Sequence, residues 1–199
     1  VMASCLKLEA DILKNCQNMP MGIRDTAYLI NIEDIDKDLC TFDPSNPLLL
    51  TSLVLNSTSP TPRAYKIEGY NFSNEHKASM VKKTYYKSWE HGFIFRVFDN
   101  TPEIKEYLVN IASSRFVVIQ ENVYNKDITS PAGRTVFEVL GWDLGLEVNA
   151  AERDAQSEEF PGWLITAGCS DKMKESKPPL AFFVGGSLTL TRAAIASLL

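Results

Sequence analysis

Apolar side chains recur at every second position along much of this chain, which is the spacing of β-strands. The alternation is clear in residues 27–32, and residues 93–98 are apolar on both faces, as in a strand between two packed layers. Polar residues 74–76 and 149–159 predict a turn and a loop. Short apolar runs lie at residues 48–55, 64–72, 78–89, 116–121, 135–140, 144–148, 163–167 and 180–184. Together the runs predict roughly nine or ten short strands.

A period near 3.6 residues replaces the alternation at one place. Asp99 or Thr101 can cap a helix there, and Pro102 suits its first position. The apolar stripe of this segment consists of Ile104, Tyr107, Leu108 and Ile111. The pattern therefore predicts a mainly β fold, a β-sandwich or barrel, with one flanking α-helix at about residues 102–114.

Both ends of the chain carry apolar residues outside this framework. Residues 1–21 are predicted to be an N-terminal arm, docked as a helix or extended, and residues 22–199 a single β-rich domain. The arm contains the apolar residues Leu6, Leu8, Ile12 and Leu13. Residues 188–199 form an apolar tail in which Arg192 is the sole charged residue. An exposed tail of this kind favours contact with a neighbouring molecule, whereas packing on its own domain is the alternative.

The charge composition of the chain indicates whether nucleic acid is an expected partner. The chain has 199 residues, a formal net charge of -5 and 45% hydrophobic residues, as expected of a folded acidic protein. Its densest basic stretch, Lys82, Lys83 and Lys87, alternates with Tyr85 and Tyr86. Such a stretch can form a nucleic-acid face, but the acidic balance favours the solvated face of a strand.

The four cysteines, Cys5, Cys16, Cys40 and Cys169, have wide and irregular spacing, which does not fit a zinc site. A pairing of Cys5 with Cys16 stays open, and free thiols in a reducing compartment are the other reading. The chain has neither a long apolar run nor a secretory pattern, so we expect synthesis in a cytoplasm and no membrane contact.

Candidate catalytic groups are few. Gly168 precedes Cys169, but the second glycine of a nucleophile elbow is missing, and His76 and His91 are the histidines that could serve as its base. Glu138 and Asp143 flank a tryptophan, as carboxylates do in sugar-cleaving sites. We expect Glu138 on the outer face of a strand and Asp143 in a turn instead.

The alternating carboxylates Asp34, Asp36 and Asp38 suggest calcium, but they lack the central glycine and the distant glutamate of such loops. Phosphate-binding glycine motifs do not occur in the sequence. We therefore expect no enzyme activity, no metal and no cofactor.

Three stretches carry a resemblance to a known family. They are residues 5–35 with Met21-Gly22-Ile23 and Tyr28-Leu29-Ile30-Asn31, residues 93–121, and residues 137–163 with Gly141-Trp142-Asp143. This arrangement resembles structural proteins of tailed bacteriophages, particularly tail-tube-like proteins of phages infecting gut Bacteroidetes.

The resemblance implies a virion protein, made in the host bacterial cytoplasm, whose copies close into rings that stack into a tube. Its partners would be copies of itself, other virion proteins and genomic DNA that passes without specific binding. An acidic lumen would let DNA slide, since phosphates would meet no cations. Ring closure also turns sheet edges into intended joints.

The predicted assembly interface comprises the two apolar ends and two polar turns. Its residues are Leu6, Leu8, Ile12, Leu13, Ser57, Thr58, Asn74, His76, Leu188, Leu190, Ile195 and Leu198. Two alternatives remain: a capsid-decorating or connector protein, and a carbohydrate- or peptide-binding β-sandwich module. The second alternative requires Trp89, Trp142 and Trp163 to be exposed on one face.

Overall fold

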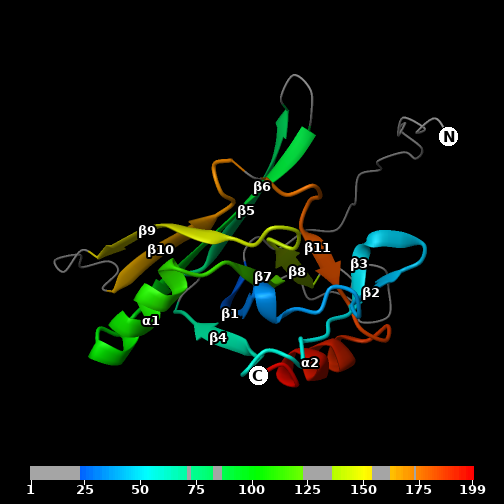
Figure 1. The fold of residues 1–199 in the computed structure, drawn as a ribbon, viewed down its shortest axis with the longest axis horizontal. Coiled ribbons are helices and arrows are strands. Elements are labelled where there is room, and N and C mark those ends of the chain that lie inside the picture. The colour runs from blue at the N-terminus through cyan, green and yellow to red at the C-terminus, as the bar shows by residue number, and fades with distance from the viewer. Residues whose placement is uncertain (1–22, 71–72, 83–86, 123–135, 154–161, 173) are drawn as a thin grey trace.

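The computed structural model describes residues 23–70, 73–82, 87–122, 136–153, 162–172 and 174–199. Over these residues the chain is mainly β, with eleven strands in two sheets and two α-helices. Figure 1 shows α1 at the lower left, near β9 and β10, and α2 at the bottom, below β11 of the larger sheet. The mainly β prediction is confirmed. The N-terminal arm lies outside the described residues.

The larger sheet has seven strands in the order β2-β3-β11-β8-β7-β1-β4. Its pairs are antiparallel except β3 with β11, which run parallel. The strands are β1 (Ile23–Asn31), β2 (Thr41–Asp43), β3 (Asn46–Ser52), β4 (Ala64–Glu68), β7 (Phe116–Asn122), β8 (Phe137–Leu140) and β11 (Leu180–Phe182).

The smaller sheet has four strands in the order β5-β6-β10-β9, and every neighbouring pair is antiparallel. The strands are β5 (Glu75–Lys82), β6 (Lys87–Val97), β9 (Glu147–Arg153) and β10 (Trp163–Gly168). β9 continues through residues 149–153, so the loop predicted from residue 149 begins later than expected. The polarity of this segment reflects its exposure at the edge of the sheet.

Two clusters of buried side chains form the core. The first lies between the seven-stranded sheet and α2, and it includes Ile30, Leu50 and Phe137. The second joins the two sheets, because it contains Leu29 of β1 together with Phe95 of β6. Each sheet therefore contributes one apolar face to a shared interior, as the strand alternation predicts.

Helix α1 (Pro102–Ala112) occurs where the sequence predicts it. The Thr101 hydroxyl accepts a hydrogen bond from the Ile104 N–H at 3.4 Å, which caps the first turn. Leu108 and Ile111 pack against the second core cluster. Tyr107 departs from the predicted stripe, since 60% of its surface is exposed.

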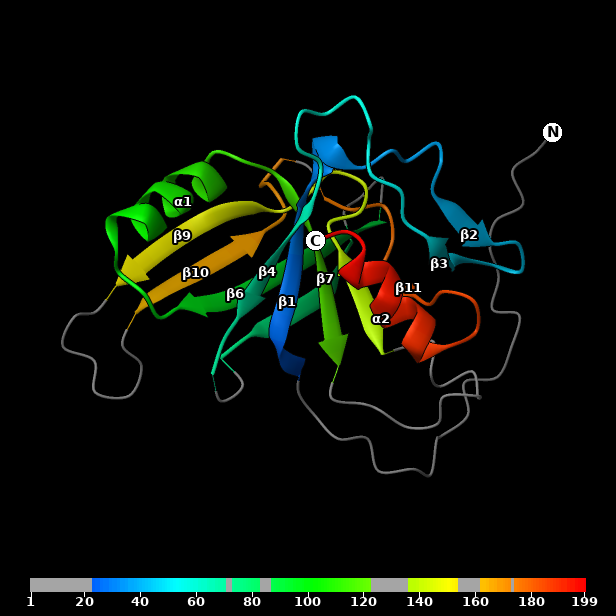
Figure 2. The same ribbon diagram turned by 90° about the horizontal axis from the view of Figure 1, so that it is seen from below.

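Helix α2 (Leu188–Ala196) is a second helix, so the prediction of one helix is wrong. Figure 2 shows α2 lying across the larger sheet near β11. Leu188, Thr191 and Ile195 are its buried residues, and their spacing of three and four residues is the helical signal that an evenly apolar tail obscures. The tail packs on its own domain.

The strand predicted at residues 78–89 is in fact a hairpin. β5 and β6 pair antiparallel, with Lys82 opposite Lys87, and β5 already begins at Glu75, where a turn was expected. Residues 83–86 are outside the described part of the chain. They contain no glycine, proline, asparagine or aspartate, so the usual turn signals are missing. Among the described residues, no helix is long and apolar enough to cross a membrane.

Candidate functional site

The structure brings Cys169 and His91 together, a contact that the sequence did not predict. Cys169 directly follows β10, and its Sγ accepts a hydrogen bond from the backbone N–H of His91 at 3.2 Å. The His91 ring instead accepts, at Nδ1, the N–H of Gly141 at 3.1 Å. Burial raises the pKa of the Cys169 thiol. The contact of the thiol is therefore with the His91 backbone, and a thiol whose pKa is raised lacks the activation that nucleophilic catalysis requires.

Glu138 and Asp143 bind separate partners. The Glu138 carboxylate contacts Nε2 of His76 at 3.0 Å. Asp143 lies in the turn between β8 and β9, and its carboxylate accepts hydrogen bonds from the backbone N–H and the hydroxyl of Ser176. Phe137 and Val139 are buried while Glu138 is half-buried, as the strand alternation predicts. Each carboxylate therefore holds segments of the chain together.

Glu175 is a buried carboxylate that sequence reasoning missed, and only 1% of its surface is exposed. Its two oxygens accept the backbone N–H groups of Asp143 at 2.7 Å and Leu144 at 3.0 Å. Its backbone exchanges hydrogen bonds with Trp89 of β6 at 2.8 and 2.9 Å. Burial raises the pKa of Glu175, and the two N–H donors act in the opposite direction. In the sequence Glu175 lies in a charged stretch with lysines and serines, and no local pattern there predicts that it is buried.

The acidic run at residues 34–38 serves the local backbone. Asp34 is buried, and its carboxylate accepts hydrogen bonds from the hydroxyl of Ser59 at 2.5 Å and from the amide of Asn31 at 3.1 Å. Asp36 accepts the N–H of Asp38 at 3.2 Å, as in an Asx turn. Within the described ranges, no group of three or more acidic, histidine or cysteine residues could hold a metal ion.

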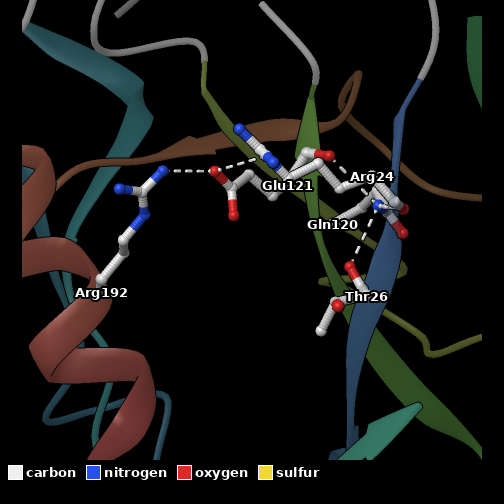
Figure 3. A network of polar contacts seen from close by, with 5 residues as sticks. All are labelled: Arg24, Thr26, Gln120, Glu121 and Arg192. Atoms are coloured by element: carbon white, nitrogen blue, oxygen red, sulfur yellow. Dashed lines mark hydrogen bonds and ion pairs between the residues drawn. The ribbon is translucent and has the colours of Figure 1, made fainter. Parts of the chain in front are cut away.

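A polar network joins β1, β7 and α2 (Figure 3). Gln120 is fully buried, and its amide donates to the carbonyls of Arg24 at 2.7 Å and Thr26 at 3.2 Å, where the β1–β7 register shifts. The Glu121 carboxylate contacts Arg24 at 3.0 Å and Arg192 at 2.6 Å. The network therefore satisfies the backbone at an irregular part of β1 and ties α2 to the sheet.

We expect Glu121→Gln to lower the free energy of unfolding by about 1–2 kcal/mol, because two arginines lose a shared charge. The loss is limited because Arg24 and Arg192 are each about half exposed, at 46% and 49%. Urea unfolding measures the change. Glu106→Gln on the exposed face of α1 is the matched control and should change stability by less than about 0.5 kcal/mol. Equal losses in the two variants would contradict the role of the network.

The aromatic and basic candidates do not form one exposed surface in the described chain. Trp142 is buried against the edge of the Phe42 ring, at 5.8 Å between ring centres. Trp89 and Trp163 are half-buried, and the Trp163 indole donates to Asn100 at 3.2 Å. The exposed Lys82 and Lys87 are the paired residues at the turn end of the β5–β6 hairpin, whereas Lys83, Tyr85 and Tyr86 lie outside the described residues.

The predicted assembly residues fall into four groups. Leu6, Leu8, Ile12 and Leu13 lie outside the described residues. Three tail residues pack inside this chain's own first core cluster, namely Leu188, Ile195 and Leu198. Asn74 is buried and donates to the Asp25 carbonyl at 2.9 Å, and His76 contacts Glu138, so both have structural partners within the chain. The surface residues of the set are Ser57, Thr58 and Leu190.

The edges of the sheets offer the clearest surfaces for association. β5 and β9 are the outer strands of the four-stranded sheet, and over the described ranges no strand pairs with their outer sides. None of the side chains of either strand is classed as buried. Strand edges of this kind present unpaired backbone N–H and C=O groups to a partner strand, and α1 lies beside part of the β9 edge.

No protein-family model matches the chain, and neither a curated protein nor a solved structure matches it. The functional argument therefore depends on the fold and on the surfaces described above.

Proposed function

We propose that this chain is a virion structural protein of a tailed bacteriophage, a tail-tube-like subunit with a β-sandwich core whose copies close into stacked rings. The observation that supports this most is the pair of outer strands on one four-stranded sheet, β5 at one side and β9 at the other, with whose outer sides no described strand pairs. A subunit with two complementary edges can associate head to tail, and head-to-tail contacts generate closed rings when the rotation between copies closes.

Strand direction favours such a joint. The four strands alternate in direction, so β5 and β9 run opposite ways. In a ring whose axis lies roughly along the strands, every copy keeps the same strand direction. β9 of one copy therefore meets β5 of the next in antiparallel orientation, and the alternation continues around the ring. An even number of strands per subunit is what makes this continuation possible.

Side-chain charge is compatible with the same joint. Lys77 of β5 lies opposite Gly92 of β6. Glu152 of β9 lies opposite Leu164 of β10, and Leu164 in turn lies opposite Arg96 of β6, four residues beyond Gly92. Lys77 and Glu152 therefore lie on the same face of the sheet. An antiparallel β5–β9 joint that places them opposite each other forms one Lys–Glu pair at each contact between copies. The genome would pass through the closed ring without sequence-specific contacts.

Charge reversal at this joint tests the proposal. We expect wild-type protein to form rings or tubes in negative-stain microscopy and to elute as an assembly from size-exclusion chromatography. Lys77→Glu or Glu152→Lys alone should raise the concentration for half assembly about tenfold, since a pair is replaced by like charges. The double variant should recover assembly, and Lys105→Glu on α1 is the matched control.

A wild-type protein that stays monomeric at every concentration would contradict the proposal. Single variants that assemble as well as wild type would place the joint elsewhere on the surface. Discrete rings that never stack would favour the connector or capsid-decorating alternative over a tube. Urea unfolding of each variant separates lost assembly from lost folding.

A further inference from the structure

An open groove leads into the second core cluster between β4 and α1. It has a volume of about 820 Å³. The buried residues Leu29, Phe95 and Phe116 line it, and so do the exposed residues Tyr65 and Tyr107. The groove therefore joins an apolar interior to a surface that presents large aromatic side chains, which is typical of a site for an apolar segment.

β4 forms one side of this groove and is also a sheet edge. It is the last strand of the seven-stranded sheet, and no described strand pairs with its outer side. Tyr65 and Ile67 lie opposite Leu29 and Ala27, whose side chains belong to the second core cluster. A strand added beside β4 would thus place alternate side chains over the groove, as in β-augmentation.

We propose that residues 5–13 of a second copy of this chain bind along β4 as this added strand. The segment reads Cys-Leu-Lys-Leu-Glu-Ala-Asp-Ile-Leu, so Leu6, Leu8, Ala10 and Ile12 alternate with polar residues over most of its length. This period of two is that of a strand with one apolar face. The inference rests on the proposed function only in requiring that copies of the chain associate.

One antiparallel register satisfies both faces of the added strand. With Leu8 opposite Ile67, Ala10 lies opposite Tyr65 on the groove side. On the other face Glu9 then lies opposite Lys66, and Lys7 opposite Glu68. Lys66 and Glu68 already form an exposed ion pair within β4, so the added charges alternate in sign with those present. A shift by one residue would turn the leucines away from the groove.

The length of the connecting chain favours a second copy over the same copy. A strand antiparallel to β4 runs parallel to β1, because β1 and β4 are antiparallel. Within one chain, residues 14–22 would start near the Ala64 end of β4, where the added strand ends. They would have to run back along the length of β4 and cross it to reach the start of β1. These nine residues are fewer than the dozen or so that connect parallel strands. A neighbouring copy avoids this constraint.

Disulfide trapping in the full-length chain tests the docking. One preparation carries Glu9→Cys and the other Lys66→Cys, both with Cys5→Ser and Cys16→Ser, while Cys40 and Cys169 are buried. A second pair, Leu8→Cys with Ile67→Cys, is used in parallel, because successive pairs alternate between wide and narrow spacing and the narrow pair suits a disulfide. The preparations are mixed, oxidised mildly and analysed by non-reducing electrophoresis and peptide mass spectrometry.

We expect a covalent dimer linking the two different chains in at least one pair, at least about tenfold above the yield with Lys105→Cys as the partner. A third preparation carries both introduced cysteines in one chain. An intramolecular disulfide in this preparation would overturn the second-copy assignment. Absence of a specific cross-link in both pairs would overturn the docking altogether. Microscopy of the same samples separates the two proposals: rings without the cross-link contradict only the docking, and the cross-link without rings contradicts only the ring.

Discussion

Glu175→Ala is expected to lower the free energy of unfolding by about 3 kcal/mol. The carboxylate is buried and accepts two backbone N–H groups of the β8–β9 turn, from Asp143 and Leu144. Removing it leaves both half-buried donors without this partner, and the loss of a buried partner typically costs about 1–3 kcal/mol. Glu175→Gln should cost less, since its carbonyl oxygen still accepts one of the two bonds. Urea unfolding followed by fluorescence of the tryptophans measures both variants.

Glu90→Ala is the matched control for this experiment. Glu90 forms an ion pair with Lys174 at 2.8 Å, but 48% of its side chain is exposed. Loss of an exposed pair changes stability by less than about 1 kcal/mol. If Glu175→Ala were no more harmful than Glu90→Ala, the buried carboxylate would not be the connection between β6 and the turn.

Acid is expected to destabilise the protein through His91. Burial lowers the pKa of His91 to about 4, whereas the backbone of Lys177 and the charge of Asp143 act in the opposite direction. The unfolded chain binds this proton at a pH near 6.5, so the neutral buried ring adds stability above that pH. The contribution is lost as the pH falls from about 6.5 towards 4. Between pH 7.5 and 4.5 the loss amounts to about 2.5 kcal/mol.

His91→Asn isolates this contribution. The asparagine oxygen can still accept the Gly141 N–H, but the side chain does not titrate, so the variant should lack the His91 part of the acid loss. Glu175 opposes His91, since its raised pKa favours proton uptake by the folded state, but this effect is common to both proteins and cancels in their difference. His76→Asn retains His91 and should retain the loss. Equal pH dependence of wild type and His91→Asn would contradict the assignment.

Local patterns predicted most of the strands and α1. The period of two in residues 27–32 corresponds to β1, and Thr101-Pro102 marks the start of α1, because capping and strand alternation depend on near neighbours in the chain. The β5–β6 hairpin was missed because its connection carries none of the usual turn residues. α2 was missed because its helical spacing lies within a tail that is apolar nearly throughout.

The candidate site depended much less on local pattern. Cys169 and His91 are 78 residues apart, and whether they meet is decided by the pairing of β6 with β10. That pairing also places the thiol against the backbone N–H of His91. The ring atom Nδ1 of His91 accepts the Gly141 N–H instead. Asn74 looks like a surface turn residue in the sequence, yet the β5 edge places it against the Asp25 carbonyl.

By itself, the sequence determined a mainly β chain, the position of α1 and an acidic balance, since each follows from residue type and spacing. Only the tertiary structure decided which strands form edges, which carboxylate is buried and where a groove opens. These features depend on contacts between residues far apart in the chain, as the pairing of β3 with β11 shows. The joint between β5 and β9 and the docking of residues 5–13 on β4 are proposals that could be framed only once those edges were placed.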